Sequence, residues 1–488
     1  MAGGKWSPTE LPVLPGFYLN FQAAALAAIK AGSRGTVIAP VKAHWGPVRQ
    51  FVEVTSEAGA TDAYTADVTN GATAYNTLRF ALLGGASKIL AYRLADSNAA
   101  AATVTLQDTN GTPANVLRLD AKYPGARGNS FKATVQVNAL DGNKKDILLF
   151  EGSALLRTFT FDSGTVQAAV DTVNGDIGNK WVTATKLADG TGVLANVTNS
   201  PFTGGNSGIA TVMSDYIDAL AAFETQEFNL LTLDGVYDPA IQTSVVSWVS
   251  RVRDEGKGVI AVLGGSAADD TAADAVNKAT TRSVGFNHEG VVNVGTGVVL
   301  NGVSYSSAQT AAYVAGLIAG QKLSESTTYA ATPFDDVTRR WTKSEMEEAV
   351  LNGVFLPFHD GRMVKVLRGM NSLVTLRQGQ NNSWKKIRTI RVMDAVNSDL
   401  VKTAEDNYIG KVNNTEEGRL ALIGACKQYM LTLAQGGVIE AIDYDVYEDP
   451  DYYGTGHPLT PEPDQVYLKW EARLTDVMEL IFSTFIVK

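Results

Sequence analysis

The residue types best suited to metal binding and nucleophilic catalysis are few and widely spaced. The 488-residue sequence contains four histidines, His44, His288, His359 and His457, and one cysteine, Cys426. No histidine lies within metal-ligand spacing of another histidine or of the cysteine, so the pattern does not indicate a zinc site. The composition allows a Ser-His-Asp arrangement, but no G-x-S-x-G motif joins a predicted strand to a helix. We therefore predict no catalytic residues, no metal and no cofactor.

Residues at the ends of predicted parallel strands are the next candidates, because open parallel sheets bind ligands at the carboxyl ends of their strands. The predicted strands 228–235, 258–265 and 291–300 end in small or acidic residues, namely Asp234, Gly264, Gly265, Ser266, Gly295 and Gly297. Neither the Gly-Gly pair nor the Gly-Thr-Gly run completes a dinucleotide fingerprint or a phosphate loop with a lysine. Glycines where strands turn into helices usually serve the backbone. If these strand ends did bind a ligand, the protein would be an α/β enzyme that binds a phosphorylated small molecule, and this is the alternative function.

Three further patterns could indicate chemistry, but each has a structural explanation. Small residues recur at every fourth position at Ala312, Gly316 and Gly320, in an apolar segment too short to span a membrane, so we expect a helix packed closely on a sheet. The acidic run 448–453 lacks the spacing of an EF-hand loop and is expected in a solvated loop. The cations of KKIRTIR (385–391) alternate with isoleucines, as on the solvated face of a strand or helix. Nucleic-acid-binding proteins usually cluster cations over a whole face.

The composition is typical of a folded protein with several domains. Hydrophobic residues make up 45% and charged residues 19% of the chain, which argues against long disordered tracts. Its length predicts about three or four domains. The net charge of -10 opposes a nucleic-acid-binding surface, and a single cysteine permits no intrachain disulfide. Because we find neither a secretory signal nor an apolar segment of about 20 residues, we expect no membrane insertion and residence in a cytoplasm.

Two types of pattern predict how the middle of the chain folds. Short β-type runs are separated by Asn-Gly at 110–111 and Asp-Gly at 141–142, which are the usual hairpin turns and predict a mainly β insertion. Strands and helices alternate after it, and Asp238 offers a helix N-cap with Pro239 at the first helical position. Buried parallel strands with covering helices explain this alternation.

Helix signals recur further along the chain. Ser306 and Gln309 have the spacing of a capping box, which predicts a helix that begins there. A later helix is predicted over about 416–434, with Asn414 or Thr415 as its cap, and strands are predicted within 364–376.

We predict an α/β and α+β multidomain fold. It has an α/β core with a βαβ-type sheet, an inserted mainly-β domain and extended N- and C-terminal arms. The predicted parts are an N-terminal arm (1–21), a small α/β unit of the core (22–96), the inserted mainly-β domain (97–204), an α/β domain (205–352), a C-terminal α+β core domain (353–465) and a C-terminal strand arm (466–488).

The two terminal segments carry the main functional signal. Residues 1–21 combine three prolines with many apolar side chains, which favours an extended chain that needs a partner surface. This pattern fits an arm and fits equally well a strand laid on its own domain. Residues 466–474 alternate as in a strand, but the following residues are apolar on both faces and must be covered on both sides. Arms that add strands to another subunit's sheet would produce head-to-tail, helical arrays.

The sequence resembles the tail sheath proteins of contractile-tailed phages, including the related defective-phage and bacteriocin particles. The matching motifs follow in order along almost the whole chain: MAGGKW...LPGFYLNF, KYPGARGNSFKATV, FTGGNSG, VVNVGTGVVLNG, SSAQTAAYVAGLIAG, RGMNSLVTL with WKKIRTIRVMDAV, and the C-terminal strand. The second and third of these look like the entry to and the exit from the inserted β domain.

The resemblance implies a structural role rather than catalysis. It implies six subunits in each ring, rings stacked helically around an inner tail tube, and arms interlocked with sheets of neighbouring subunits. It also implies that the core near 205–465 faces the tube and that the inserted domain lies outward. The expected intersubunit arm residues are Trp6, Leu14, Phe17, Tyr18, Leu468, Trp470, Leu480, Phe482, Phe485 and Val487, and the expected hinge residues are Gly16, Pro458, Pro461 and Pro463.

The expected function follows from this resemblance. The extended sheath would be a metastable array that a trigger at the baseplate releases, so that it contracts and drives the tube through the target cell envelope without nucleotide. The expected partners are sheath subunits, the inner tube protein, the baseplate and the tail terminator, in a virion tail or tail-like particle assembled in a bacterial host cytoplasm. Another self-assembling particle protein, such as a tube or capsid subunit, fits the arms but not the βαβ region.

Overall fold

The computed structural model describes residues 2–4, 16–18, 35–190 and 192–487. The chain divides into two compact units. The larger unit comprises Ser33–Lys322 and Ser326–Ile390, and the smaller unit comprises Met1–Gly32, Leu323–Glu325 and Arg391–Lys488. Several separate sheets and many helices are present, which confirms the predicted mixed α/β, multidomain class.

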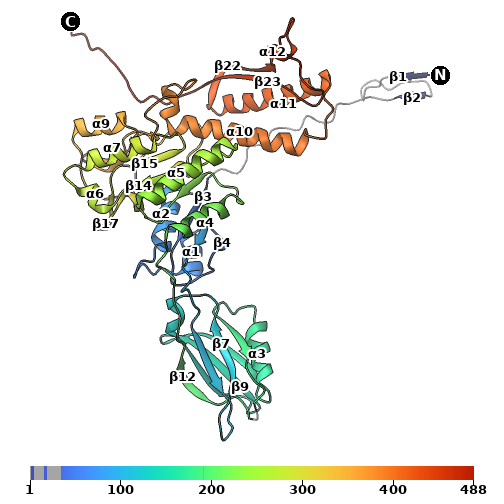
Figure 1. Ribbon diagram of the computed structural model, residues 1–488, viewed down its shortest axis with the longest axis vertical. Coiled ribbons are helices and arrows are strands. Elements are labelled where there is room, and N and C mark those ends of the chain that lie inside the picture. The colour runs from blue at the N-terminus through green and yellow to red at the C-terminus, as the bar shows by residue number, and fades with distance from the viewer. Residues whose placement is uncertain (1, 5–15, 19–34, 191, 488) are drawn as a thin grey trace. The chain divides into compact units, whose positions relative to one another are not determined.

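A seven-stranded sheet forms the centre of the larger unit (Figure 1). Its strands, in spatial order, are β19 (Val354–Phe355), β15 (Val291–Val294), β14 (Ile260–Gly264), β13 (Leu230–Thr232), β3 (Thr36–Val41), β5 (Lys88–Arg93) and β4 (Phe51–Val54). All neighbours are parallel except β4, which runs antiparallel to β5. Every residue of β3, β13, β14 and β15 is buried, as expected for parallel strands covered on both faces.

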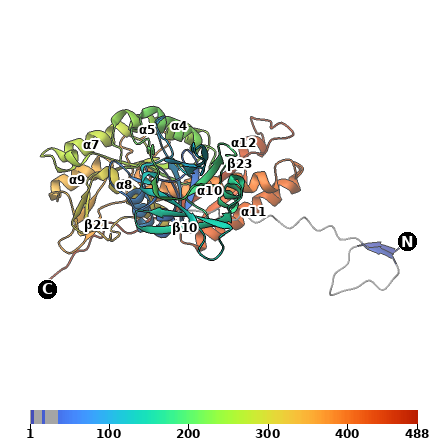
Figure 2. The ribbon, with the colours of Figure 1, turned by 90° about the horizontal axis from the view of Figure 1, so that it is seen from below.

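Helices cover both faces of this sheet. On one face, α4 (Met213–Phe223) and α5 (Pro239–Asp254) share an apolar cluster with alternate residues of the strands, and both helices lie along one side of the unit in Figure 2. On the other face, α2 (Ala74–Gly84) and α8 (Ser307–Gly320) lie against the central strands. Outside the inserted domain, this unit also contains α1 (Glu57–Tyr64), α6 (Ala267–Thr271), α7 (Ala275–Phe286) and α9 (Lys343–Leu351).

Local capping signals determine where two of these helices begin. The Asp238 carboxylate accepts hydrogen bonds from the backbone N–H groups of Ala240 and Ile241, at 2.8 and 3.2 Å, and Pro239 is the first residue of α5. At α8, the Ser306 hydroxyl accepts from the Gln309 N–H, and the Gln309 side chain accepts from the Ser306 N–H. Both predicted caps are confirmed.

The small residues of α8 contact a different partner from the one predicted. A Cβ added to Gly316 would clash with the backbone of Ala81, and one added to Gly320 would lie 2.6 Å from the Gly85 carbonyl oxygen. Both of these contacts belong to α2 and its C-cap. The prediction of close packing is correct, but this glycine face packs on a helix rather than on the sheet.

The inserted domain lies between β5 and α4 and contains two antiparallel sheets. One has the order β10 (Ala154–Asp162), β9 (Lys144–Glu151), β8 (Phe131–Val137) and β12 (Val197–Pro201), and the other has β11 (Val182–Lys186), β7 (Asn115–Ala121) and β6 (Thr103–Gln107). A single apolar cluster combines side chains from both sheets with α3 (Val166–Gly175). The predicted Asn-Gly and Asp-Gly turns lie between β6 and β7 and between β8 and β9.

Three local predictions are wrong in part. Only β21 (Val364–Val366) forms within 364–376, because backbone groups beyond it bond elsewhere, as when the Ser372 N–H donates to the Val291 carbonyl. The cations of KKIRTIR were expected on a solvated face, but Arg388 and Arg391 are buried in α10 (Ile387–Asn407). The acidic run 448–453 lies at the surface, with residues that are exposed or half-buried, yet it includes the helical turn α12 (Pro450–Tyr453) rather than only a loop.

Short elements complete the larger unit. Strand β16 (Val298–Leu300) lies between β17 (Val303–Tyr305) and β18 (Asp336–Val337), and β20 (Pro357–His359) pairs with β21. Two 3-10 turns, η1 (Ala126–Ser130) and η2 (Asn382–Lys385), precede β8 and α10.

The smaller unit is built on α11 (Glu416–Gln435) and a two-stranded antiparallel sheet of β22 (Ile439–Glu448) and β23 (Leu468–Leu474). The predicted cap Thr415 accepts from the Gly418 N–H at 3.1 Å. Buried residues of α10, α11 and β22, including Cys426, form its core, against which Trp470 and Leu474 of β23 pack. The N-terminal strands β1 (Ala2–Gly4) and β2 (Gly16–Tyr18) pair in parallel.

Candidate assembly surfaces

The strand ends that could have bound a ligand are filled by the protein itself. A Cβ on Gly264 would clash with the backbone of Ser307, and one on Gly265 would clash with the guanidinium of Arg282. Gly295 and Gly297 are equally close to neighbouring atoms, those of Val354 and Tyr305. These glycines therefore allow close packing, and they leave no cradle for a phosphate.

The acidic and hydroxyl residues near these ends also serve the fold. The buried Asp234 carboxylate accepts hydrogen bonds from the Tyr216 hydroxyl at 2.8 Å and from the Thr73 hydroxyl at 3.0 Å, and lies 3.3 Å from the Lys42 ammonium. Ser266 caps α6 by accepting from the Asp269 N–H at 3.0 Å. All of these contacts are internal.

Asp270 is a buried carboxylate that sequence reasoning missed. It accepts hydrogen bonds from the Ser307 N–H and the Ser307 hydroxyl, both at 2.6 Å, at the first residue of α8. Burial raises the pKa of Asp270 to about 6, although both bonds from Ser307 favour the charged form. The contact links α6 to α8 and has a structural role.

The described residues contain no metal site. Among residues 35–190 and 192–487, no three or more histidine, cysteine, aspartate or glutamate side chains are grouped so that they could hold a metal ion. In the same part of the chain, no helix combines the length and the apolar character needed to cross a membrane.

The predicted N-terminal arm is described only in part. Trp6 and Leu14 lie outside the described residues. Gly16, Phe17 and Tyr18 form β2, which pairs with β1 through Ala2↔Gly16, Gly3↔Phe17 and Gly4↔Tyr18.

The predicted C-terminal arm residues fall into two groups. Leu468 and Trp470 lie in β23 and are half-buried, and Trp470 packs on the core of its own unit. Leu480, Phe482, Phe485 and Val487 lie beyond the strand, in a segment with neither helix nor strand, and are 71–89% exposed. A row of large apolar side chains left in water is unusual in a folded protein, which makes this segment a candidate assembly surface.

The sheet of the smaller unit offers a surface that such a segment could fit. Ile439 pairs with Leu474 and Tyr444 with Ala472, so residues 440–443 bulge out of the ladder. Ile442 is 98% exposed on this bulge. It borders an open groove of about 420 Å³ between α11 and β22, which is lined by Gly424, Lys427, Gln428, Leu431, Ala441, Ile442, Tyr444 and Asp445. Sequence reasoning missed Ile442, because strand alternation does not reveal a bulge.

The predicted hinge prolines precede β23. The side-chain amide of Asn414 donates to the carbonyl oxygens of Pro463 and Gln465, both at 2.9 Å, which holds this segment against the start of α11. Pro458 and Pro461 lie before this attachment, in a stretch without helix or strand. Their hinge role stays a prediction.

Models of three protein domains match successive parts of the chain. Residues 96–207 match the phage tail sheath protein beta-sandwich domain, residues 210–372 the phage tail sheath protein central domain, and residues 379–488 the phage tail sheath C-terminal domain. In this order they define a structural component of contractile tails. The chain belongs to the phage tail sheath family.

Similar proteins of known sequence or structure agree with this assignment. The phage-like element PBSX protein XkdK of Bacillus subtilis is 27% identical over 469 residues, covering 91% of this chain and 92% of that protein. A sheath tail protein from Desulfitobacterium hafniense has a crystal structure that matches with a TM-score of 0.69 and 28% identity, over 89% of this chain and 94% of that one. The helical sheath of the anti-feeding prophage, solved in its contracted state, shares the fold with a TM-score of 0.56 and 14% identity, over 98% and 100% of the two chains.

The family settles the broad function. The protein is a tail sheath subunit, a structural and non-enzymatic component of a phage tail or tail-like particle. The alternative of a ligand-binding α/β enzyme is not supported, and the filled strand ends agree with this outcome.

Proposed function

We propose that this subunit polymerises into stacked hexameric rings around an inner tail tube, and that the stack contracts to drive the tube through a target cell envelope. The observation that carries the proposal is the exposed apolar segment 475–487, next to a two-stranded sheet. A two-stranded sheet is marginal alone and gains stability from further strands.

The proposed contact is strand addition between copies. Residues 466–488 and 1–21 are the proposed arms. Because β23 already pairs with β22 of its own subunit, residues 475–488 and 1–21 are the parts that add to the edges of the β22–β23 sheet in a neighbouring copy. The groove beside Ile442 gives the incoming apolar side chains a place to leave water. Burying a Phe or Leu side chain contributes roughly 1.5–3 kcal/mol, so Leu480, Phe482 and Phe485 together can hold a neighbour firmly.

Such contacts produce an open array. Because donor and acceptor are different surfaces, the contact is heterologous and can continue along a helix instead of closing on itself. Gly16, Pro458, Pro461 and Pro463 would let the arms turn while the lattice stays connected. The anti-feeding prophage sheath, which has the same fold and was solved in a contracted state, supports a contractile array.

The proposed parts keep the division expected from the sequence. The core near 205–465 would face the tube and the insertion of 97–204 would lie outward. The proposed partners are sheath subunits, the inner tube protein, the baseplate and the tail terminator, and the particle would assemble in a bacterial host cytoplasm. Energy stored in assembly would replace nucleotide hydrolysis.

Deletion of residues 475–488 tests the arm assignment. We expect a soluble, folded subunit that forms no tubes, because the exposed donor segment is gone while the core of the smaller unit is intact. Circular dichroism checks folding and electron microscopy checks assembly.

A matched control separates the arm from general surface hydrophobicity. Leu140 and Ile177 of the inserted domain are as exposed as the arm residues, so L140S/I177S should leave tube formation unchanged. Normal tubes from the truncated subunit, or loss of tubes in the control, would contradict the arm assignment.

A further inference from the structure

The junction between the inserted domain and the α/β core is built differently from an ordinary linker. The insertion joins the core only through the segments that follow β5 and precede α4. Domains joined in this way are expected to move relative to each other unless their interface is large and apolar. Here four features restrain the junction.

The first feature is a buried cation that binds three chain segments. The Arg93 guanidinium, at the end of β5, is completely buried. It donates to the carbonyl oxygens of Gly46 at 2.6 Å, Pro124 at 2.7 Å and Ser207 at 3.1 Å. Gly46 belongs to the core, Pro124 belongs to the connection between β7 and β8 inside the insertion, and Ser207 belongs to the segment that leaves the insertion. Burial lowers the pKa of Arg93 only to about 10, so it stays charged at neutral pH.

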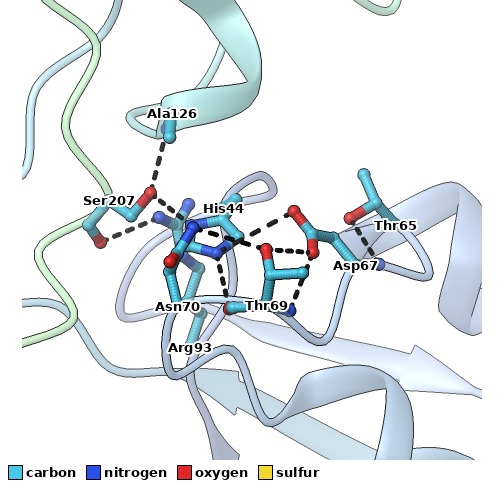
Figure 3. A network of polar contacts seen from close by, with 8 residues as sticks. All are labelled: His44, Thr65, Asp67, Thr69, Asn70, Arg93, Ala126 and Ser207. Carbon is cyan, nitrogen blue, oxygen red and sulfur yellow. Dashed lines mark hydrogen bonds and ion pairs between the residues drawn. The ribbon is translucent and has the colours of Figure 1, made fainter.

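The second feature is a histidine network beside this cation (Figure 3). His44 Nε2 lies 3.0 Å from the Thr69 carbonyl oxygen, which can only accept, so this nitrogen carries the proton. In the neutral ring Nδ1 then accepts from the Ser207 hydroxyl at 2.8 Å. The same hydroxyl oxygen accepts from the Ala126 N–H at 2.9 Å. One serine of the exit segment thus connects His44 of the core to the β7–β8 connection of the insertion.

The third feature is an aromatic side chain of the core packed inside the insertion. Trp45 is buried and belongs to the apolar cluster of the inserted domain. Its ring makes edge contacts with Tyr123 and Phe131, at centroid distances of 5.2 and 5.4 Å, and the Arg127 guanidinium lies 5.1 Å from its centroid. The insertion therefore cannot separate from the core without exposing part of its own interior.

The fourth feature is close backbone contact at two glycines. A Cβ on Gly125, whose φ is +151°, would clash with the His44 carbonyl. A Cβ on Gly205 would lie 2.5 Å from the Gly125 carbonyl oxygen. Both glycines come from the motifs KYPGARGNSFKATV and FTGGNSG, so these motifs meet in space at the junction.

From these four features we infer that the junction holds the inserted domain and the core together as one rigid body, with Arg93 as its positioning residue. We call this set of contacts the lock. An uncharged side chain at position 93 would leave three carbonyl groups without their shared donor, and this loss would free the domain to tilt. The consequence for a sheath is that large movements of the insertion originate in motion of the whole core. This last step rests on the proposed function, whereas the lock itself is a property of the free subunit.

Distance measurements between spin labels test the lock. Leu140→Cys at the tip of the insertion and Ile217→Cys on α4 are both exposed, and the native Cys426 is buried and takes no label. We expect a single narrow distance distribution in the free subunit. Arg93→Met should broaden this distribution or split it. Arg93→Lys should give an intermediate width, because lysine keeps the positive charge but has fewer directed donors.

A control variant removes an exposed contact across the same junction. Lys180 of the insertion lies 2.9 Å from Asp62 of α1, and both side chains are more than 60% exposed, so K180A should leave the distribution unchanged. A broad distribution in the otherwise wild-type labelled subunit, or a narrow one in folded R93M, overturns the inference.

Assembled tubes provide a second readout that does not depend on the variants. The lock predicts the same Leu140→Cys to Ile217→Cys distance within one subunit in tubes, diluted with unlabelled subunits, as in the free protein. A shifted distance overturns the inference even if R93M fails to fold. If no tubes form, the proposed function is contradicted. The distance distribution in the free subunit then still tests whether the junction is rigid.

Discussion

Asp270 illustrates how a single buried group can affect the stability of the whole subunit. Its partner Ser307 is 37 residues away in the sequence, and the carboxylate is 2% exposed. Burial favours the protonated form, and the pKa of Asp270 is about 6, against an ordinary value of 3.8. No sequence motif could have revealed this, because the shift depends on burial and on a partner brought close by folding.

The first prediction concerns the pH dependence of stability. Between pH values near 4 and 6 the unfolded chain releases the Asp270 proton while the folded chain retains it, so the free energy of unfolding should fall as pH rises through this window. The change from this group is on the order of 3 kcal/mol, and it is complete above the folded pKa.

Asp270→Asn removes this titration and keeps an acceptor for the Ser307 N–H. We therefore expect the free energy of unfolding of D270N minus that of wild type, measured in urea, to increase from about pH 4 to about pH 6 and then to stay constant. D189N is the matched control, because it removes one negative charge at an exposed position. Equal pH profiles for D270N and wild type would contradict the assignment.

At the scale of single elements, the signals that could be predicted are those that lie close together in the sequence. Asp238, Ser306 and Thr415 cap their helices as predicted, because a cap needs only a side chain and an N–H two or three residues further on. The partner of the glycine face on α8 could not be predicted from the sequence. Close packing against either a helix or a sheet requires small residues, so the glycine spacing does not distinguish the two.

Gly316→Ala tests the contact between α8 and α2. The new methyl group would clash with the backbone of Ala81, which cannot rotate away as a side chain could, so we expect a loss of about 1–3 kcal/mol in the free energy of unfolding.

Gly285 near the end of α7 is the matched control. Nothing lies within 4 Å of a Cβ at this position, so G285A should be neutral or stabilising by up to about 1 kcal/mol through helix propensity. Denaturant unfolding measures both variants. A stable G316A would mean that the two helices are less closely packed than described.

At the scale of the whole molecule, the fold class and the protein family could be predicted from the sequence, whereas the bulge and the domain junction could not. The ordered motifs predict the family, because each marks a turn or contact that the fold requires, as Gly125 and Gly205 do at the domain junction. The bulge at Ile442 and the buried Arg93 depend on strand register and on contacts between distant segments, so neither could be predicted. Leu480, Phe482 and Phe485 could be predicted as an unsatisfied apolar segment, since an extended chain places apolar side chains on both of its faces there.

Negative-stain electron microscopy of the purified full-length chain tests the central claim most directly. A sheath subunit whose exposed terminal residues add to neighbouring copies should form hollow tubes of stacked rings, wide enough to surround an inner tube. Discrete small particles at high protein concentration would contradict the account, because the exposed apolar segment 475–487 would then have no partner in another copy.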